Sequence, residues 1–125
     1  MFSLSSSHTF LLYPQICDMR KIFDGLCGIV TNELGRVAHS GEVFIFVNRK
    51  KNQIKLLHWE AGGFVLYHKR LEEATFAMVN HNDLRISWSD LVLMIEGIHI
   101  IKSSKKKAIF YVDLSKKELL ELIKK

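Results

Sequence analysis

The chain has 125 residues, 48% of them apolar, with one proline and seven glycines. This length and composition predict one folded domain with a real hydrophobic core and argue against a disordered chain. The net charge of +5 permits attraction to nucleic acid or an acidic partner without requiring it. No apolar run approaches the roughly 18 residues of a membrane-spanning helix. The N-terminus lacks the pattern of a signal peptide, so we expect a cytoplasmic protein with no membrane partner.

Two elements are expected in the first third of the chain. The short apolar run from Thr9 to Tyr13 predicts an edge strand. Apolar side chains then recur at helical spacing over residues 19–34, with Asp18 as the expected N-cap and Gly35 as the C-terminal stop. Gly25, inside this helix, would permit the close approach of another backbone.

Three strands rich in β-branched and aromatic residues are expected in the middle of the chain. They are Val43 to Arg49, Gln53 to Trp59 and Phe64 to Leu71. Turns at "RKKN" and "EAGG" connect them into an antiparallel meander. With the tightest symmetric turns, Phe46 faces Lys55 and Trp59 faces Phe64.

The last third mixes expected loop, helix and strand. Residues 72–83 have mixed signals and predict a loop, whereas "ISWSDLVLMIEGI" predicts a helix capped by Ser87, with Asp90 at the capping-box position and Gly97 at its end. The stretch "KAIFYVDL" predicts a further strand, and "SKKELLELIKK" a short amphipathic helix. The predicted fold class is therefore α+β: a three-stranded antiparallel meander packed against helices on one face, to which additional edge strands can be added.

Strand alternation divides the meander into two faces. The first is almost entirely apolar and is expected to pack against the helices; it carries Val43, Ile45, Val47, Ile54, Leu56, Val65 and Tyr67. The second interleaves rings with cations; it carries Phe44, Phe46, Asn48, Lys55, Leu57, Trp59, Phe64, Leu66, His68 and Arg70. Bases stack on aromatic rings and Lys or Arg neutralises phosphate, so the second face is a candidate nucleic-acid surface. The alternative is a second core layer under a helix, with Lys55 and Arg70 reaching solvent along their stems.

The sequence lacks the usual patterns of catalysis and of metal binding. No phosphate-loop glycine motif occurs. Cys17 and Cys27 are too few for a disulfide framework or a four-thiolate zinc site. His58 and His68 are expected on opposite faces, which disfavours a shared metal. We therefore expect no enzyme, no catalytic residues, no metal and no cofactor.

Three stretches together resemble the TnpB accessory proteins of the insertion sequence 66 family, second-frame products of bacterial transposable elements. They are "CDMRKIFDGLCGIV" (17–30), "SGEVFIFVNRKKNQIKLLHWEAGGFVLYHKRLE" (40–72) and "ISWSDLVLMIEGI" (86–98), and the resemblance covers roughly residues 8 to 98. The matching positions are Asp18, Met19, Arg20, Lys21, Asp24, Gly25, Asn48, Arg49, Lys55, Trp59, Gly63, Phe64, Lys69, Arg70 and Leu71. The family often has an aromatic residue where His58 or His68 stands here. The resemblance divides the chain into an accessory domain, 1–101, and a basic C-terminal tail, 102–125, with a short strand and helix.

The resemblance implies an accessory, non-catalytic role in transposition, beside a separate transposase that cleaves and joins strands. The implied partners are DNA, above all the element ends, the transposase and another accessory protein of the same element. Combined with the basic and aromatic face, it predicts nucleic-acid binding by Arg20, Lys21, Arg49, Lys50, Lys51, Lys55, Trp59, Phe64, Lys69 and Arg70. The alternative function is that of an adaptor that docks on the transposase without direct DNA contact.

Overall fold

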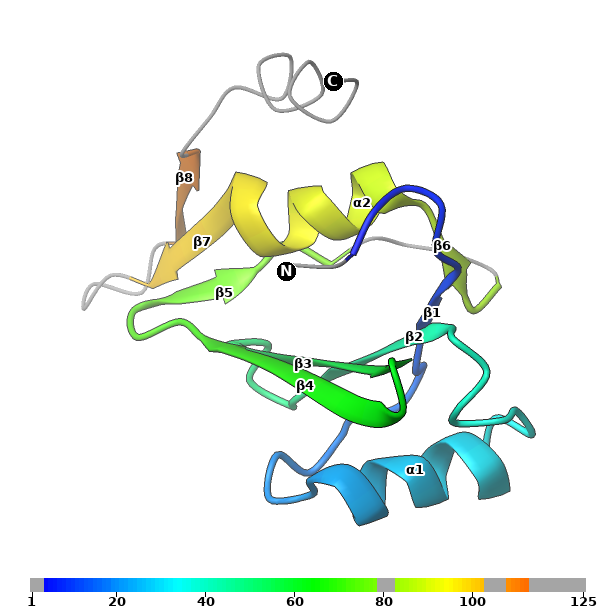
Figure 1. Ribbon diagram of the computed structural model, residues 1–125. Helices are drawn as coiled ribbons and strands as arrows, with labels where there is room; N and C mark the ends of the chain where they lie inside the picture. Colours follow the sequence, from blue (N-terminus) through cyan, green and yellow to red (C-terminus); the bar gives the residue numbers. More distant parts are fainter. Residues whose placement is uncertain (1–3, 79–82, 103–107, 113–125) are drawn as a thin grey trace.

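The computed structural model describes residues 4–78, 83–102 and 108–112, and it has an α+β fold (Figure 1). The strands are β1 (Phe10–Leu12), β2 (Val43–Val47), β3 (Gln53–Glu60), β4 (Gly63–Arg70), β5 (Ala74–Phe76), β6 (Arg85–Ile86), β7 (Ile98–Lys102) and β8 (Ala108–Val112). The helices are α1 (Phe23–Asn32) and α2 (Trp88–Val92), which continues into the π-helical turn η1 (Leu93–Gly97). A five-stranded mixed sheet has the order β4-β3-β2-β1-β6, and a three-stranded sheet has the order β5-β7-β8.

Two antiparallel hairpins, β2–β3 and β3–β4, supply three of the five strands of the larger sheet. Phe46 pairs with Lys55 and Trp59 pairs with Phe64, which is the register expected from the two turns. β1 pairs in parallel with β2 and antiparallel with the two-residue β6. The strand predicted at the edge of the sheet therefore lies inside it, and that prediction is wrong.

Both faces of the larger sheet are covered. Figure 1 shows α1 on one side of this sheet and α2 with η1 on the other. Val43, Ile45, Val47, Ile54 and Leu56 pack with Leu91, Met94 and Ile95 of α2 and η1. Phe44, Phe46 and Leu57 pack with Leu26, Ile29 and Val30 of α1.

The prediction that helices pack on one face only, with the aromatic face open, is wrong. Phe44, Phe46 and Leu57 are fully buried in the cluster that includes α1. The physical reason is that α1 carries its own apolar stripe, which must also be removed from water. Two amphipathic helices need two apolar surfaces, and the two faces of the sheet supply them.

The start of α1 differs from the sequence prediction, whereas its end agrees. α1 begins at Phe23, and its N-cap residue, Ile22, makes no side-chain capping bond. Asp18 is therefore not the cap; it accepts a hydrogen bond from the Arg20 N–H at 2.9 Å in the turn before the helix. Gly35 has a φ of +63° just beyond the helix, a left-handed conformation that suits the predicted glycine stop.

The second helical segment begins and ends as predicted. The Ser87 hydroxyl accepts a hydrogen bond from the Asp90 N–H at 3.1 Å, and η1 ends at Gly97. The loop expected over 72–83 instead contains β5, whose Phe76 is buried in the core and donates its N–H to the Lys51 carbonyl. The predicted strand near 108–112 is β8, while the predicted helix at 115–125 lies outside the described residues. In the described part of the chain, no helix has the length and apolarity needed to cross a membrane.

Candidate nucleic-acid interface

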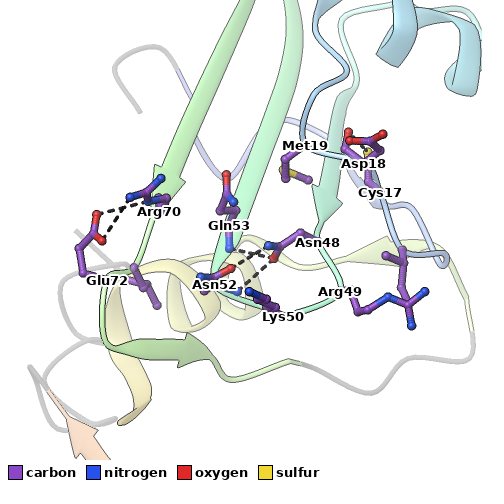
Figure 2. A pocket seen from close by; sticks show the side chains of 12 residues that line it. Cys17, Asp18, Met19, Asn48, Arg49, Lys50, Asn52, Gln53, Arg70 and Glu72 are labelled. Atoms are coloured by element: carbon purple, nitrogen blue, oxygen red, sulfur yellow. Dashed lines mark hydrogen bonds and ion pairs between the residues drawn. The ribbon is translucent and has the colours of Figure 1, made fainter. Parts of the chain in front are cut away.

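An open hollow of about 700 Å³ lies at the end of the larger sheet where the β2–β3 turn, the segment before α1 and the end of β4 meet (Figure 2). Its lining includes the cations Arg49, Lys50 and Arg70, the carboxylates Asp18 and Glu72, the amides Asn48, Asn52 and Gln53, and the apolar or sulfur-bearing Ile16, Cys17, Met19 and Leu71. Polar and charged groups thus lie beside apolar surface in one open depression. Three of the cations predicted to bind nucleic acid, Arg49, Lys50 and Arg70, therefore lie around one depression.

The β2–β3 turn is fixed by the side chain of Asn48. Its Oδ1 accepts hydrogen bonds from the backbone N–H of Asn52 at 3.1 Å and of Gln53 at 3.0 Å, and its Nδ2 donates to Asn52 Oδ1 at 2.7 Å. Lys51 completes the turn with a φ of +57°, in the left-handed region. The sequence prediction did not give Asn48 a functional role, although an asparagine that opens a turn is a known signal of this geometry.

Arg49 and Lys50 occupy the tip of this turn, and both are exposed. Within the described ranges, neither side chain makes a hydrogen bond or an ion pair. Arg70 lies on the opposite side of the hollow, and among the described residues its side chain binds only Glu72, in an exposed ion pair with both contacts at 3.3 Å. Such a pair contributes little to stability, so Arg70 can exchange Glu72 for another anion at small cost.

Arg20 and Lys21 lie beside the hollow in the turn before α1. The Arg20 guanidinium binds Asp18 through both carboxylate oxygens, and hydrogen bonds from Arg20 lower the pKa of Asp18 to about 2. The stem of Lys21 lies against Gly25, where an added Cβ would come within 3.1 Å of Lys21 Cβ. The group that approaches this glycine is therefore a side chain and not the expected second backbone.

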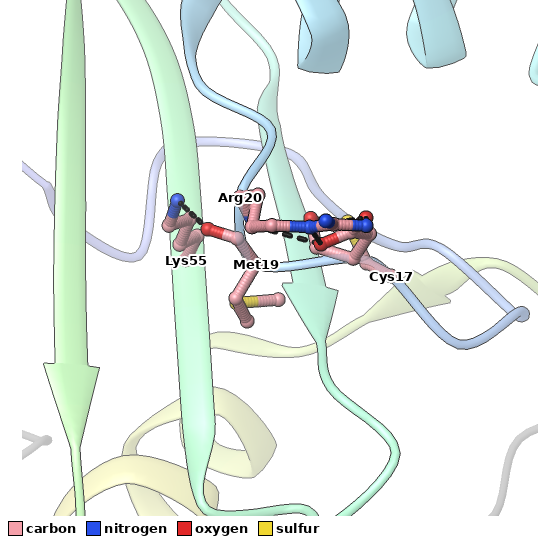
Figure 3. Close-up of polar contacts among 5 residues, drawn as sticks. Cys17, Met19, Arg20 and Lys55 are labelled. Atoms are coloured by element: carbon pink, nitrogen blue, oxygen red, sulfur yellow. Dashed lines mark hydrogen bonds and ion pairs between the residues drawn. The ribbon is translucent and has the colours of Figure 1, made fainter.

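Lys55 does not face solvent, and the prediction that it does is wrong. Its side chain lies on the face covered by α1, and the residue is 3% exposed. Its Nζ donates to the Met19 carbonyl at 2.8 Å, as Figure 3 shows, and also to the Lys21 carbonyl at 2.8 Å. A buried ammonium requires acceptors, and the turn before α1 supplies two. Lys55 thus holds that turn, and with it Arg20 and Lys21, against the sheet.

Lys69 is also engaged within the fold. Its Nζ donates to the Ile95 carbonyl at 3.0 Å and lies 3.6 Å from a carboxylate oxygen of Glu96. Because neighbouring residues of a strand point to opposite faces, Lys69 lies on the η1 side and Arg70 on the α1 side. Lys69 thereby ties β4 to the π-helical turn.

Trp59 and Phe64 pair with each other at the far end of the β3–β4 hairpin. Their ring centroids are 4.8 Å apart at an interplanar angle of 69°, and both residues are half-buried. Trp59 lies six positions along β3 from Gln53 at the hollow, which corresponds to about 20 Å. Rings and cations therefore do not form one continuous platform.

The ten residues predicted to bind nucleic acid fall into three groups. Arg49, Lys50, Lys51 and Arg70, with Arg20 and Lys21 beside them, gather around the hollow and the β2–β3 turn, and we call these six residues the basic cluster. Lys55 and Lys69 bind backbone carbonyls inside the fold. Trp59 and Phe64 lie at the other end of the hairpin.

The described residues offer no arrangement suited to metal binding, since no group of three or more His, Cys, Asp or Glu side chains is placed to hold an ion. Burial raises the pKa of the Cys17 thiol, which lines the hollow, although the nearby Lys55 and Lys21 act in the opposite direction. A raised pKa leaves the thiol protonated at neutral pH, the less nucleophilic form.

Comparison with known proteins gives a family match and a curated relative. A family model described as "IS66 Orf2 like protein" matches residues 8–105. The chain is 23% identical over 108 residues to a protein of Sinorhizobium fredii (strain NBRC 101917 / NGR234) described as "Uncharacterized protein y4jC", covering 85% of this chain and 92% of that protein. No solved structure matches the chain.

Proposed function

Because the chain belongs to the IS66 Orf2-like family, whose members are transposition-associated accessory proteins, we propose that it binds DNA of its element through the basic cluster. The observation that carries this proposal is the pair Arg49 and Lys50. Both are exposed at the tip of a turn fixed by Asn48, and in the described part of the chain neither has an internal partner.

The chemistry of the basic cluster suits the sugar–phosphate backbone. Arg49 and Lys50 neutralise phosphates and release counterions, which supplies affinity without sequence information. Arg70 joins them from β4 when a phosphate replaces Glu72 as its anion. Lys51, Arg20 and Lys21 extend the positive surface on both sides of the hollow. The open form of the hollow admits a backbone segment without rearrangement of the sheet.

Within this proposal the two lysines that bind backbone carbonyls, Lys55 and Lys69, serve the fold. Lys55 holds the turn that carries Arg20 and Lys21, and Lys69 holds the end of β4 that carries Arg70. In this proposal a separate transposase cleaves and joins the DNA strands. This chain acts in the cytoplasm on the DNA of the element ends, together with the transposase and another accessory protein. It uses no cofactor and no metal.

A second candidate function is an adaptor that docks on the transposase. The observation that favours it is the exposure of apolar side chains at the start of α1, where Ile22 is 60% and Phe23 40% exposed. Exposed apolar groups close together are typical of protein-binding surfaces. In this function the basic cluster would serve solubility and steer an acidic partner.

A gel-shift titration with duplex DNA of the element ends, with and without the transposase, separates the two functions. DNA binding predicts a shift by the chain alone that weakens steeply as salt rises from about 50 to 200 mM. No shift at the lowest salt, together with capture of the transposase on the immobilised chain, would overturn DNA binding and support the adaptor.

A further inference from the structure

The outer edge of β4 has backbone groups that no other strand uses. β4 is the last strand in the order of the larger sheet, and Figure 1 shows it at the rim. The Leu71 N–H donates to the Asn52 carbonyl at 2.7 Å, so the odd-numbered residues of β4 direct their N–H and C=O groups to β3. By the alternation of antiparallel pairing, the corresponding groups of Phe64, Leu66, His68 and Arg70 point away from the sheet.

These outward groups have no hydrogen-bond partner within the described ranges. The strand also lacks two devices that protect an edge, since it contains neither a proline nor a break in its pairing with β3. Lys69, the one lysine of the strand, is folded toward the Ile95 carbonyl and does not guard the edge. Val65 is 46% exposed, so the edge also presents apolar surface.

We propose that two copies of the chain pair antiparallel through their β4 edges and form one continuous sheet. In the register that uses every outward group, Phe64 lies opposite Arg70 of the second copy, and Leu66 lies opposite His68. The same register sets Lys69 opposite Val65 and Tyr67 opposite its own equivalent, so no cation faces a cation. A shift by one pair in either direction leaves outward groups unpaired, and one of the two shifts brings His68 opposite His68.

The pairing has a geometric consequence for the molecule. A two-fold axis perpendicular to the sheet keeps the α1 layer of both copies on the same side. The two basic clusters then face the same way, at opposite ends of the paired β4 strands. The pairing rests on the free edge alone and does not depend on the proposed DNA binding.

Two substitutions at one position test the pairing. His68→Pro removes an outward N–H but no donor to β3, so the sheet within one copy keeps its hydrogen bonds. His68→Ala removes the same side chain, including its contact with Gln53 at 2.9 Å, and keeps the N–H. In sedimentation equilibrium over a wide concentration range, we expect wild type and His68→Ala at twice the monomer mass and His68→Pro at the monomer mass, with matching circular dichroism.

A second pair of variants covers the outcome in which His68→Pro fails to fold. Val65 is exposed and faces Lys69 of the second copy, so Val65→Lys should weaken dimerisation and Val65→Glu should leave it intact or strengthen it. Wild type at the monomer mass at every concentration would overturn the proposal, as would equal dimerisation of Val65→Lys and Val65→Glu. A monomer that uses this edge only when the transposase is added would show that the edge receives a strand of that protein instead.

Discussion

The buried ammonium of Lys55 donates a hydrogen bond to the carbonyl of Met19 at 2.8 Å, across 36 positions of the sequence. The Lys21 carbonyl accepts a second bond from the same group. A cation that the strand pattern assigned to a nucleic-acid surface therefore anchors the turn that carries Arg20. The basic cluster lies around Lys55, so the hydrogen bonds that stabilise this part of the fold also fix the positions of the exposed cations.

Replacement of Lys55 by methionine should lower the free energy of unfolding by about 2–6 kcal/mol. The apolar chain fills a similar volume, but two carbonyls lose their donor, and each unsatisfied group costs about 1–3 kcal/mol. Denaturant unfolding of Lys55→Met measures the change. Lys50→Met, on the exposed turn, is the control and should stay within about 0.5 kcal/mol of wild type. Equal stability of the two variants would show that the Lys55 bonds are dispensable.

Asn48 should matter for stability and for DNA binding together. Asn48→Ala removes the side-chain bonds that close the β2–β3 turn, and we expect a loss of about 1–3 kcal/mol. DNA affinity should fall as well, because Arg49 and Lys50 lose their fixed backbone. Asn48→Asp keeps the oxygen that accepts from Asn52 and Gln53 and should retain more stability than the alanine variant. Denaturant unfolding and DNA titrations of both variants test this expectation. Wild-type stability and wild-type DNA affinity in Asn48→Ala would contradict it.

Trp59 should contribute to stability but not to DNA binding. Its ring pairs with Phe64 and also lies 6.0 Å, centroid to centroid, from the His39 ring. Trp59→Ala removes a half-buried aromatic group, at a cost of about 2 kcal/mol. The DNA affinity of the folded variant should equal that of wild type, because the ring lies far from the basic cluster. A large loss of affinity with unchanged stability would instead support base stacking on Trp59.

Acidification should destabilise the protein through His58. Burial, followed by the adjacent His8 ring at 4.8 Å, lowers the pKa of His58 below its ordinary value, and its Nδ1 has no partner among the described residues. As the pH falls through about 6.5, the unfolded chain takes up a proton at this position and the folded chain resists it. The free energy of unfolding should therefore decrease as the pH falls below that value.

Denaturant unfolding at about pH 7.5 and about pH 5.5 measures this loss of stability, because the two pH values lie on either side of the ordinary histidine pKa. His58→Leu should reduce the difference between the two conditions, and the exposed His39→Gln should not. Part of the difference should persist in His58→Leu, because burial, Lys55 and Arg70 also lower the pKa of His68. An unchanged difference in His58→Leu would exclude His58 as the source.

Strand pairing could be predicted from the sequence because alternation and turn residues fix the register locally. The pairs Phe46–Lys55 and Trp59–Phe64 follow from two short turns, and the Ser87 cap follows from a local capping pattern. The covering of the faces could not be predicted in this way, because it depends on contacts between distant segments. The apolar stripe of α1 was the available signal that the aromatic face would be covered.

The candidate site was predicted in part for the same reason. Arg49 and Lys50 belong to a local turn, so their exposure follows from the sequence. The hydrogen-bond partners of Lys55 and Lys69 do not follow from the sequence, since each ammonium group binds a carbonyl that is far away in the chain. β5 was missed because its three residues pair with β7, and short strands with distant partners leave little trace in the local pattern.

The central claim is that Arg49 and Lys50 bind the DNA backbone of the element ends. The most direct measurement is the salt dependence of Kd for end DNA, in wild type, Arg49→Ala, the Arg49→Ala/Lys50→Ala double variant and the charge-matched control Arg85→Ala on β6. We predict that the slope of log Kd against log salt falls by about one for Arg49→Ala and by about two for the double variant, and that Arg85→Ala keeps the wild-type slope. Identical slopes for Arg49→Ala and Arg85→Ala, or no binding of end DNA by wild type, would contradict the claim.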